Sequence, residues 1–138
     1  VPPPDGIVIQ AVLDSTITVT NDLCRQRIVQ FTLQAYPFFN FFGPDGGIYL
    51  VNVAINGGAF VLDHVIKFVI TGANTAGTTH GADFKSSLNR WVAVPPGGGV
   101  ASMRIRIDFL RSNTVTPPNG GVIDTGYTGM TLNALFVS

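Results

Sequence analysis

Glutamate is absent from these 138 residues, and only two lysines, Lys67 and Lys85, are present. Charged residues make up 12% of the chain, against roughly 25% in a typical globular domain. Glu and Lys normally line the solvent-facing sides of helices, so their scarcity beside abundant Val, Ile, Thr and Phe predicts strands. So few charges cover little of a monomer's surface, which favours a permanent oligomer. The formal net charge of zero argues against a nucleic-acid partner.

Cysteine is limited to Cys24, so no internal disulfide framework is available. We expect a buried or half-buried structural thiol there, because free cysteines are among the most buried residue types. There is no Asn-x-Ser/Thr sequon, and no apolar run reaches the ~18 residues of a membrane helix, so we expect no membrane insertion. The chain begins at Val1 without a signal peptide, which suggests a processed product or an excised fragment.

Motifs of catalysis and cofactor binding are also missing. Neither a Gly-x-Ser-x-Gly elbow nor a phosphate-binding Gly-x-x-x-x-Gly-Lys loop occurs. The two histidines, His64 and His80, have no further ligands at metal-binding spacing. We therefore predict a protein that is not an enzyme and holds no cofactor and no metal. At His64 we expect a hydrogen-bonded structural histidine.

What the sequence does contain is alternation of apolar and polar residues with a period of two. The clearest run, 100–111, places Met103, Ile105 and Ile107 on one face and Arg104 and Arg106 on the other. Only 81–89 suits a short helix. Other alternating or apolar runs predict strands at 6–13, 16–20, 27–34, 47–55, 63–71, 90–94 and 129–137.

Turn residues separate these runs at the short spacing of a sandwich. Asn56-Gly57-Gly58 is the clearest hairpin signal, because Asn and Gly tolerate the positive φ of tight hairpins. Pro-Gly-rich turns lie at 44–47, 95–99 and 117–121. We predict one domain over residues 1–138, an all-β antiparallel sandwich of jelly-roll type with about 8–10 strands.

An aromatic segment at 36–42 contains more apolar side chains than one sandwich core can absorb. Adjacent Phe residues on a strand point to opposite faces, so one of each pair should lie outside the domain's own core. We expect these residues to form an oligomer interface; the alternative is an edge segment covered by a loop. The predicted interface residues are Tyr36, Phe38, Phe39, Phe41, Phe42 and Tyr49.

Ligand-binding candidates lie in a polar segment and beside two aromatic residues. The segment 72–83 is a candidate binding loop, although a simple solvated loop is the favoured interpretation. Trp91 and Tyr127 lie beside short polar residues, as a sugar-binding surface requires, although we expect Trp91 to pack in the core. The predicted ligand-binding residues are Asn74, Thr78, Thr79, His80, Asp83, Arg90, Trp91, Asp124 and Tyr127.

Three parts of the chain together resemble the tumour-necrosis-factor/C1q type of jelly roll. Pro44–Val51 is similar to that superfamily's Gly-hydrophobic-Tyr-hydrophobic strand entry, and Arg104–Phe109 resembles its late amphipathic strand. Asp124–Tyr127 followed by Met130–Val137 resembles its closing Gly/aromatic loop and apolar last strand. The resemblance implies a homotrimer with a threefold aromatic core that recognises a receptor or ligand.

Three functions follow as hypotheses. The first is a homotrimeric recognition head of a virus or phage fibre or spike, located on the virion or outside the cell, with a cell-surface receptor or glycan as partner. This viral variant is favoured because the chain lacks the disulfide, sequon and membrane stalk of the cytokines. The second is a carbohydrate-binding, lectin-like sandwich. The third is a structural virion or capsid subunit, ranked last because the chain has no basic arm.

Overall fold

The computed structural model describes residues 8–42, 45–70, 80–83, 86–112 and 121–138. Side chains are described for 13–36, 48–66, 86–108 and 130–138. Every regular element in these ranges is a β-strand, which confirms the all-β prediction, and no helix long and apolar enough to cross a membrane is among them. The strands are β1 Val8–Asn21, β2 Arg27–Phe42, β3 Asp45–Ile55, β4 Val61–Ile70, β5 His80–Asp83, β6 Ser86–Val94, β7 Gly99–Ser112 and β8 Gly121–Phe136.

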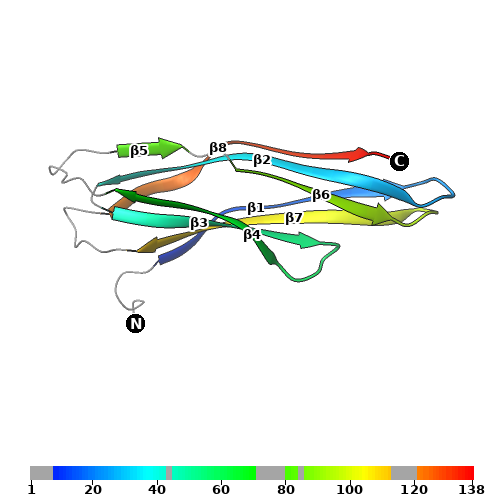
Figure 1. The fold of residues 1–138 in the computed structure, drawn as a ribbon, viewed down its shortest axis with the longest axis horizontal. Coiled ribbons are helices and arrows are strands. Elements are labelled where there is room, and N and C mark those ends of the chain that lie inside the picture. Colours follow the sequence, from blue (N-terminus) through cyan, green and yellow to red (C-terminus); the bar gives the residue numbers. More distant parts are fainter. Residues whose placement is uncertain (1–7, 43–44, 71–79, 84–85, 113–120) are drawn as a thin grey trace.

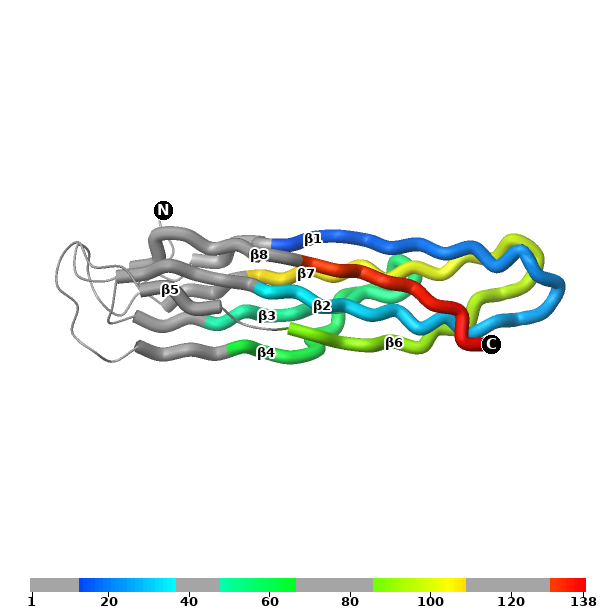
Figure 2. Tube along the Cα trace, turned by 90° about the horizontal axis from the view of Figure 1, so that it is seen from above, coloured from blue at the N-terminus to red at the C-terminus, as the bar shows by residue number. Residues whose placement is uncertain are grey.

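The strands form two antiparallel sheets that lie face to face (Figure 1). The first sheet has the order β1-β7-β3-β4. In the second sheet β2 is central, with β8 along one edge and β6 followed by β5 along the other. Figure 2 shows β1 and β8 side by side along one long side of the molecule, with β4 and β6 on the opposite side.

Pairing between the strands is nested in the manner of a jelly roll. β3 pairs with the next strand, β4; β2 pairs with β5 and β6; and β1 pairs with β7. The chain therefore forms one long antiparallel ribbon that wraps into two sheets, which is the arrangement a jelly roll requires. β8 then pairs with β2 from Val29 to Phe42. The predicted fold class is confirmed.

The core lies between the sheets and is built by alternation. Met103, Ile105 and Ile107 of β7 are fully buried, while Arg104 between them is exposed. Across the sandwich, Phe31 and its alternate neighbours in β2 are buried in the same way. Each such side chain contributes roughly 1.5–3 kcal/mol by leaving water.

The turn at Asn56 confirms the predicted hairpin. Asn56 has a φ of 52° and Gly57 a φ of 72°. Two successive positive φ values are the geometry of a tight hairpin turn, which only residues such as Asn and Gly adopt readily. The Gly58 amide closes the turn by donating to the Ile55 carbonyl at 2.9 Å.

Three expectations were wrong. The expected helix at 81–89 is replaced by β5 and β6, because pairing with β2 overrides the local signal. The separate strands expected at 6–13 and 16–20 form the single strand β1, which continues through a register shift between Ala11 and Leu13. Cys24 is exposed rather than buried, because β1 ends at Asn21 and the thiol lies in the following loop.

A buried asparagine joins the β1–β2 loop to the β6–β7 turn by hydrogen bonds, at one end of the sandwich. Asn21 has no exposed surface. Its Nδ2 donates to the carbonyls of Arg25, Val94 and Pro95 at 2.8, 3.1 and 3.2 Å. Its Oδ1 accepts from the Leu23 amide at 3.1 Å. One side chain thus satisfies backbone groups from both connections, and we call this end the apex.

Candidate functional site

The outer surface of the second sheet is uncharged where its side chains are described. Alternate residues of its three long strands face away from the core, and none of those with described side chains carries a charge. We call this surface the neutral face. Its residues are Ser87, Asn89, Trp91 and Ala93 of β6, Gln30, Thr32, Gln34 and Tyr36 of β2, and Thr131, Asn133 and Leu135 of β8.

Strand register arranges this face in rows. Gln30 pairs with Trp91 on one side and Leu135 on the other. Trp91 and Leu135 are each 63% exposed, an unusually large exposure for such apolar side chains. In the next row, Thr32 lies between Asn89 of β6 and Asn133 of β8. The face therefore combines large apolar side chains with carboxamides and hydroxyls in ordered rows.

The opposite outer surface, formed by the first sheet, has a different character. Arg104 donates to Asp14 from Nε at 2.9 Å and from Nη2 at 2.7 Å, across β7 and β1. The hydrogen bond from Arg104 is the main cause that holds the pKa of Asp14 below its ordinary value. A second pair joins Arg106 to Asp108 at 3.0 Å. The outer surface of the first sheet thus carries paired charged side chains, whereas the described residues on the outer surface of the second sheet are uncharged.

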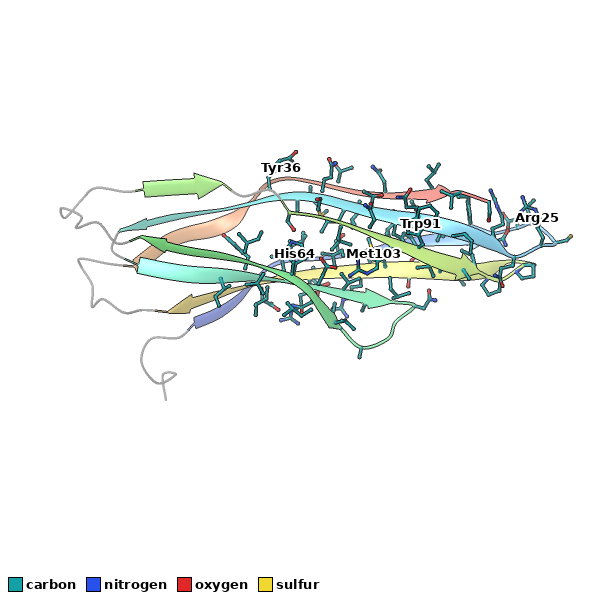
Figure 3. The ribbon with its side chains drawn as sticks, viewed as in Figure 1. Arg25, Tyr36, His64, Trp91 and Met103 are labelled. Atoms are coloured by element: carbon teal, nitrogen blue, oxygen red, sulfur yellow. The ribbon has the colours of Figure 1, made fainter. Side chains whose placement is uncertain are left out.

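A polar cluster joins the two sheets on the side where β4 and β6 lie. Nδ1 of His64 lies 2.5 Å from a carboxylate oxygen of Asp63, and its Nε2 lies 2.9 Å from the Ser86 hydroxyl. The other carboxylate oxygen of Asp63 accepts from Arg90. Figure 3 shows His64 between the two layers.

A β-bulge explains how two adjacent residues point into this cluster. Val51 pairs with His64 and Asn52 with Leu62, so Asp63 is an extra residue in β4. A bulge of this kind re-aims a side chain that would otherwise point to the opposite face. Both Asp63 and His64 can then reach β6 from the first sheet.

Burial and hydrogen bonding compete at Asp63. Burial favours its neutral form, but the hydrogen bonds from Arg90 and His64 outweigh this and hold the pKa of Asp63 below its ordinary value. The Asp-His-Ser connectivity is that of an activated nucleophile. Ser86 is only 1% exposed, however, so its hydroxyl has no open surface at which to meet a substrate. The cluster is suited to linking the sheets.

The predicted ligand-binding residues fall into separate places. Trp91 lies on the neutral face, 63% exposed, so the expectation that it packs in the core was wrong. Arg90, its neighbour, points to the other side of β6 and binds Asp63. Asn74, Thr78 and Thr79 lie outside the described residues.

Four further candidates lie together along the backbone. β2 pairs with His80 and Asp83 of β5 on one edge and with Asp124 and Tyr127 of β8 on the other. All four pair within residues 37–41 of β2, whereas Trp91 pairs with Gln30 nearer the other end. The backbone therefore brings these four to one end of the sheet and leaves Trp91 apart; their side chains lie outside the described set.

The predicted interface residues are likewise divided. Tyr36 is 41% exposed and projects from the neutral face (Figure 3). Tyr49 has no exposed surface and packs in the core of the subunit. The side chains of the remaining predicted interface residues are not described, although their backbone belongs to β2. These are Phe38, Phe39, Phe41 and Phe42.

Sequence reasoning missed the partners of both sites. The alternation in 27–34 already indicated that Gln30 faces outward, but the pairing that places it between Trp91 and Leu135 is not visible in the sequence. No motif in the sequence marks Ser86, and only the pairing of the strands places it beside His64. For His64, the prediction of a hydrogen-bonded structural histidine is confirmed.

Comparison with known proteins does not place this chain in a family. A scan against protein-family models and a search of curated proteins both gave no match.

Proposed function

We propose that this domain is a homotrimeric, non-enzymatic recognition head, and that neighbouring copies cover the neutral face. The observation that carries the proposal is the exposure of Trp91 and Leu135 on a surface whose described side chains are all uncharged. Large apolar side chains gathered on one face are typical of association surfaces. Interface centres are also depleted in charge and enriched in aromatic residues.

The gain from covering this face is substantial. A tryptophan side chain has about 150–250 Å² of surface to bury, and 63% of Trp91 is exposed. At ~25 cal/mol per Å², covering that part stabilises an assembly by about 2–4 kcal/mol per subunit. Tyr36 and Leu135 add to this. The sum suits a lasting rather than a transient contact, once the entropy of association is subtracted.

The trimer and its setting are supported by the resemblance to the tumour-necrosis-factor/C1q jelly rolls. The low overall charge supports the same assembly. We place the head on a virus or phage fibre or spike, on the virion or outside the cell, where it recognises a cell-surface receptor or glycan.

Carbohydrate binding by a monomer is the second candidate. It is favoured by Trp91 itself, because an exposed aromatic ring beside the carboxamides of Asn89 and Gln30 can stack on a sugar and bind its hydroxyls. The two functions use one surface, so they exclude each other at the neutral face.

Sedimentation analysis of the purified domain distinguishes these functions. We expect a trimer at micromolar concentration that dissociates in the Leu135→Asp variant, because a charge would be buried unpaired. The matched control is Leu23→Asp, at an exposed leucine of the apex, which should stay trimeric. A wild-type monomer at this concentration overturns the trimer. Glycan binding by that monomer, lost in Trp91→Ala, then supports the second candidate.

A further inference from the structure

The fourth strand of the first sheet, β4, forms an edge of that sheet. The first sheet has the order β1-β7-β3-β4, so β4 pairs with β3 alone within it. The polar cluster links β4 to β6 of the facing sheet. The hairpin between β3 and β4 stands out from the sandwich in Figure 1.

The beginning of β4 is exposed and apolar on both sides. Val61 is 66% exposed and its neighbour Leu62 is 51% exposed. Adjacent residues of a strand point to opposite faces, so neither side of the strand is covered here. Phe60, just before the strand, is 37% exposed and Val65 is 45% exposed, and both add to the exposed apolar area. We call these four residues the arm.

The arm is held in a fixed position although its side chains are exposed. At its base, Asp63 and His64 bind Arg90 and Ser86 of the second sheet. At its tip, the Arg104 guanidinium lies 5.0 Å from the centre of the Phe60 ring, a cation–π contact. An exposed apolar segment that is fixed in this way loses little conformational freedom when it binds, which favours docking.

We propose that the arm of one copy packs against the neutral face of the next copy, in a head-to-tail contact. The inference rests on the proposed homotrimer and names the surfaces that meet in it. The described residues of the neutral face carry no charge. The charged groups that border the arm are paired, Arg104 with Asp14 and Asp63 with Arg90, so burying one surface against the other leaves no ion unpaired.

The positions of the two surfaces determine the symmetry of the contact. The arm belongs to the edge of the first sheet, and the neutral face is the outer surface of the second. A contact between two different patches is heterologous, and it closes into a ring when the rotation between copies permits. Every copy then offers one arm and one face, and a ring of three uses them all.

Three leucine-to-aspartate variants test this contact by sedimentation velocity. Leu62→Asp alters the arm, Leu135→Asp alters the face, and Leu23→Asp is the control at the apex. We expect the first two to be monomers, with apparent affinity lowered at least 100-fold, and the control to remain trimeric. Val65→Asp is a second arm variant and should behave like Leu62→Asp.

Mixing the two monomeric variants gives the decisive result. The Leu135→Asp copy retains an intact arm and the Leu62→Asp copy an intact face, so one native contact can form between them. We expect a heterodimer at raised concentration and nothing larger, since both remaining surfaces are altered. Its formation also shows that both variants fold.

The outcomes separate this inference from the proposed function. A trimer that survives both arm variants, while Leu135→Asp dissociates it, overturns the arm contact and leaves the trimeric head standing. Homodimers of either variant alone indicate that each surface pairs with itself, which also overturns the inference. A monomeric wild type overturns both proposals.

Discussion

Replacing Asn21 with alanine removes the hydrogen-bond centre of the apex. The carboxamide bonds backbone groups of Arg25, Val94, Pro95 and Leu23 and has no exposed surface. In the variant, groups near the solvent can bond water, whereas the carbonyl of the fully buried Val94 loses a partner that water does not replace. A buried unsatisfied polar group costs about 1–3 kcal/mol and an ordinary hydrogen bond contributes about 1 kcal/mol. We therefore expect Asn21→Ala to lower the free energy of unfolding by about 2–4 kcal/mol.

Urea unfolding followed by circular dichroism measures this change. With a slope of about 1–3 kcal/mol per molar urea, the loss moves the midpoint down by roughly 0.7–4 M. All samples must share one protein concentration, because association stabilises the folded state. Gln26→Ala, an exposed residue of the same loop, is the control and should change stability by less than about 0.5 kcal/mol. If Asn21→Ala lowered the free energy of unfolding as little as the control does, the hydrogen bonds of Asn21 would not stabilise the apex, and this prediction would be refuted.

The remaining predictions concern the polar cluster and the β6–β7 turn. Because the pKa of Asp63 is lowered in the folded state, its contribution is present above the unfolded pKa and is lost as pH falls below 3.8. Asp63→Asn should therefore show a shallower loss of stability between about pH 5 and pH 2 in urea titrations; a wild-type slope would contradict this. Gly99→Ala should destabilise the fold by more than about 2 kcal/mol, because the added Cβ would lie 2.4 Å from the Pro95 carbonyl oxygen. Thermal unfolding of this variant checks the steric cause, with Val100→Ala, at an exposed residue of the same strand, as comparison. An unchanged midpoint in Gly99→Ala would exclude that cause.

Local patterns in the sequence predicted the strands and their buried faces. The alternation around Met103 and Ile105 appears in the structure as one buried and one charged side of β7, because a strand's period of two is fixed by its backbone. The Asn56 turn followed from the same local chemistry, since positive φ is restricted to a few residue types.

The pairing of distant strands was not predictable in the same way. The alternation in 27–34 indicates that Gln30 faces outward, but only the strand register places Gln30 between Trp91 and Leu135. The polar cluster depends on a bulge at Asp63, and a bulge leaves no distinct mark in a run of apolar residues. For Trp91, size alone favoured the core, whereas its position opposite Gln30 places it outside.

The nested ribbon also determines how this chain must fold. β3 and β4 are joined by the short segment 56–60, so their hairpin closes at small entropic cost and on a microsecond timescale. Val8 and Arg111, the most distant pair of β1 and β7, meet only after nearly the whole chain between them has been ordered. Such non-local contacts slow folding toward the millisecond-to-second range. We therefore expect the central hairpin to form first and the outer pairs to follow, which leaves the aromatic stretch of β2 accessible to other chains while synthesis is incomplete.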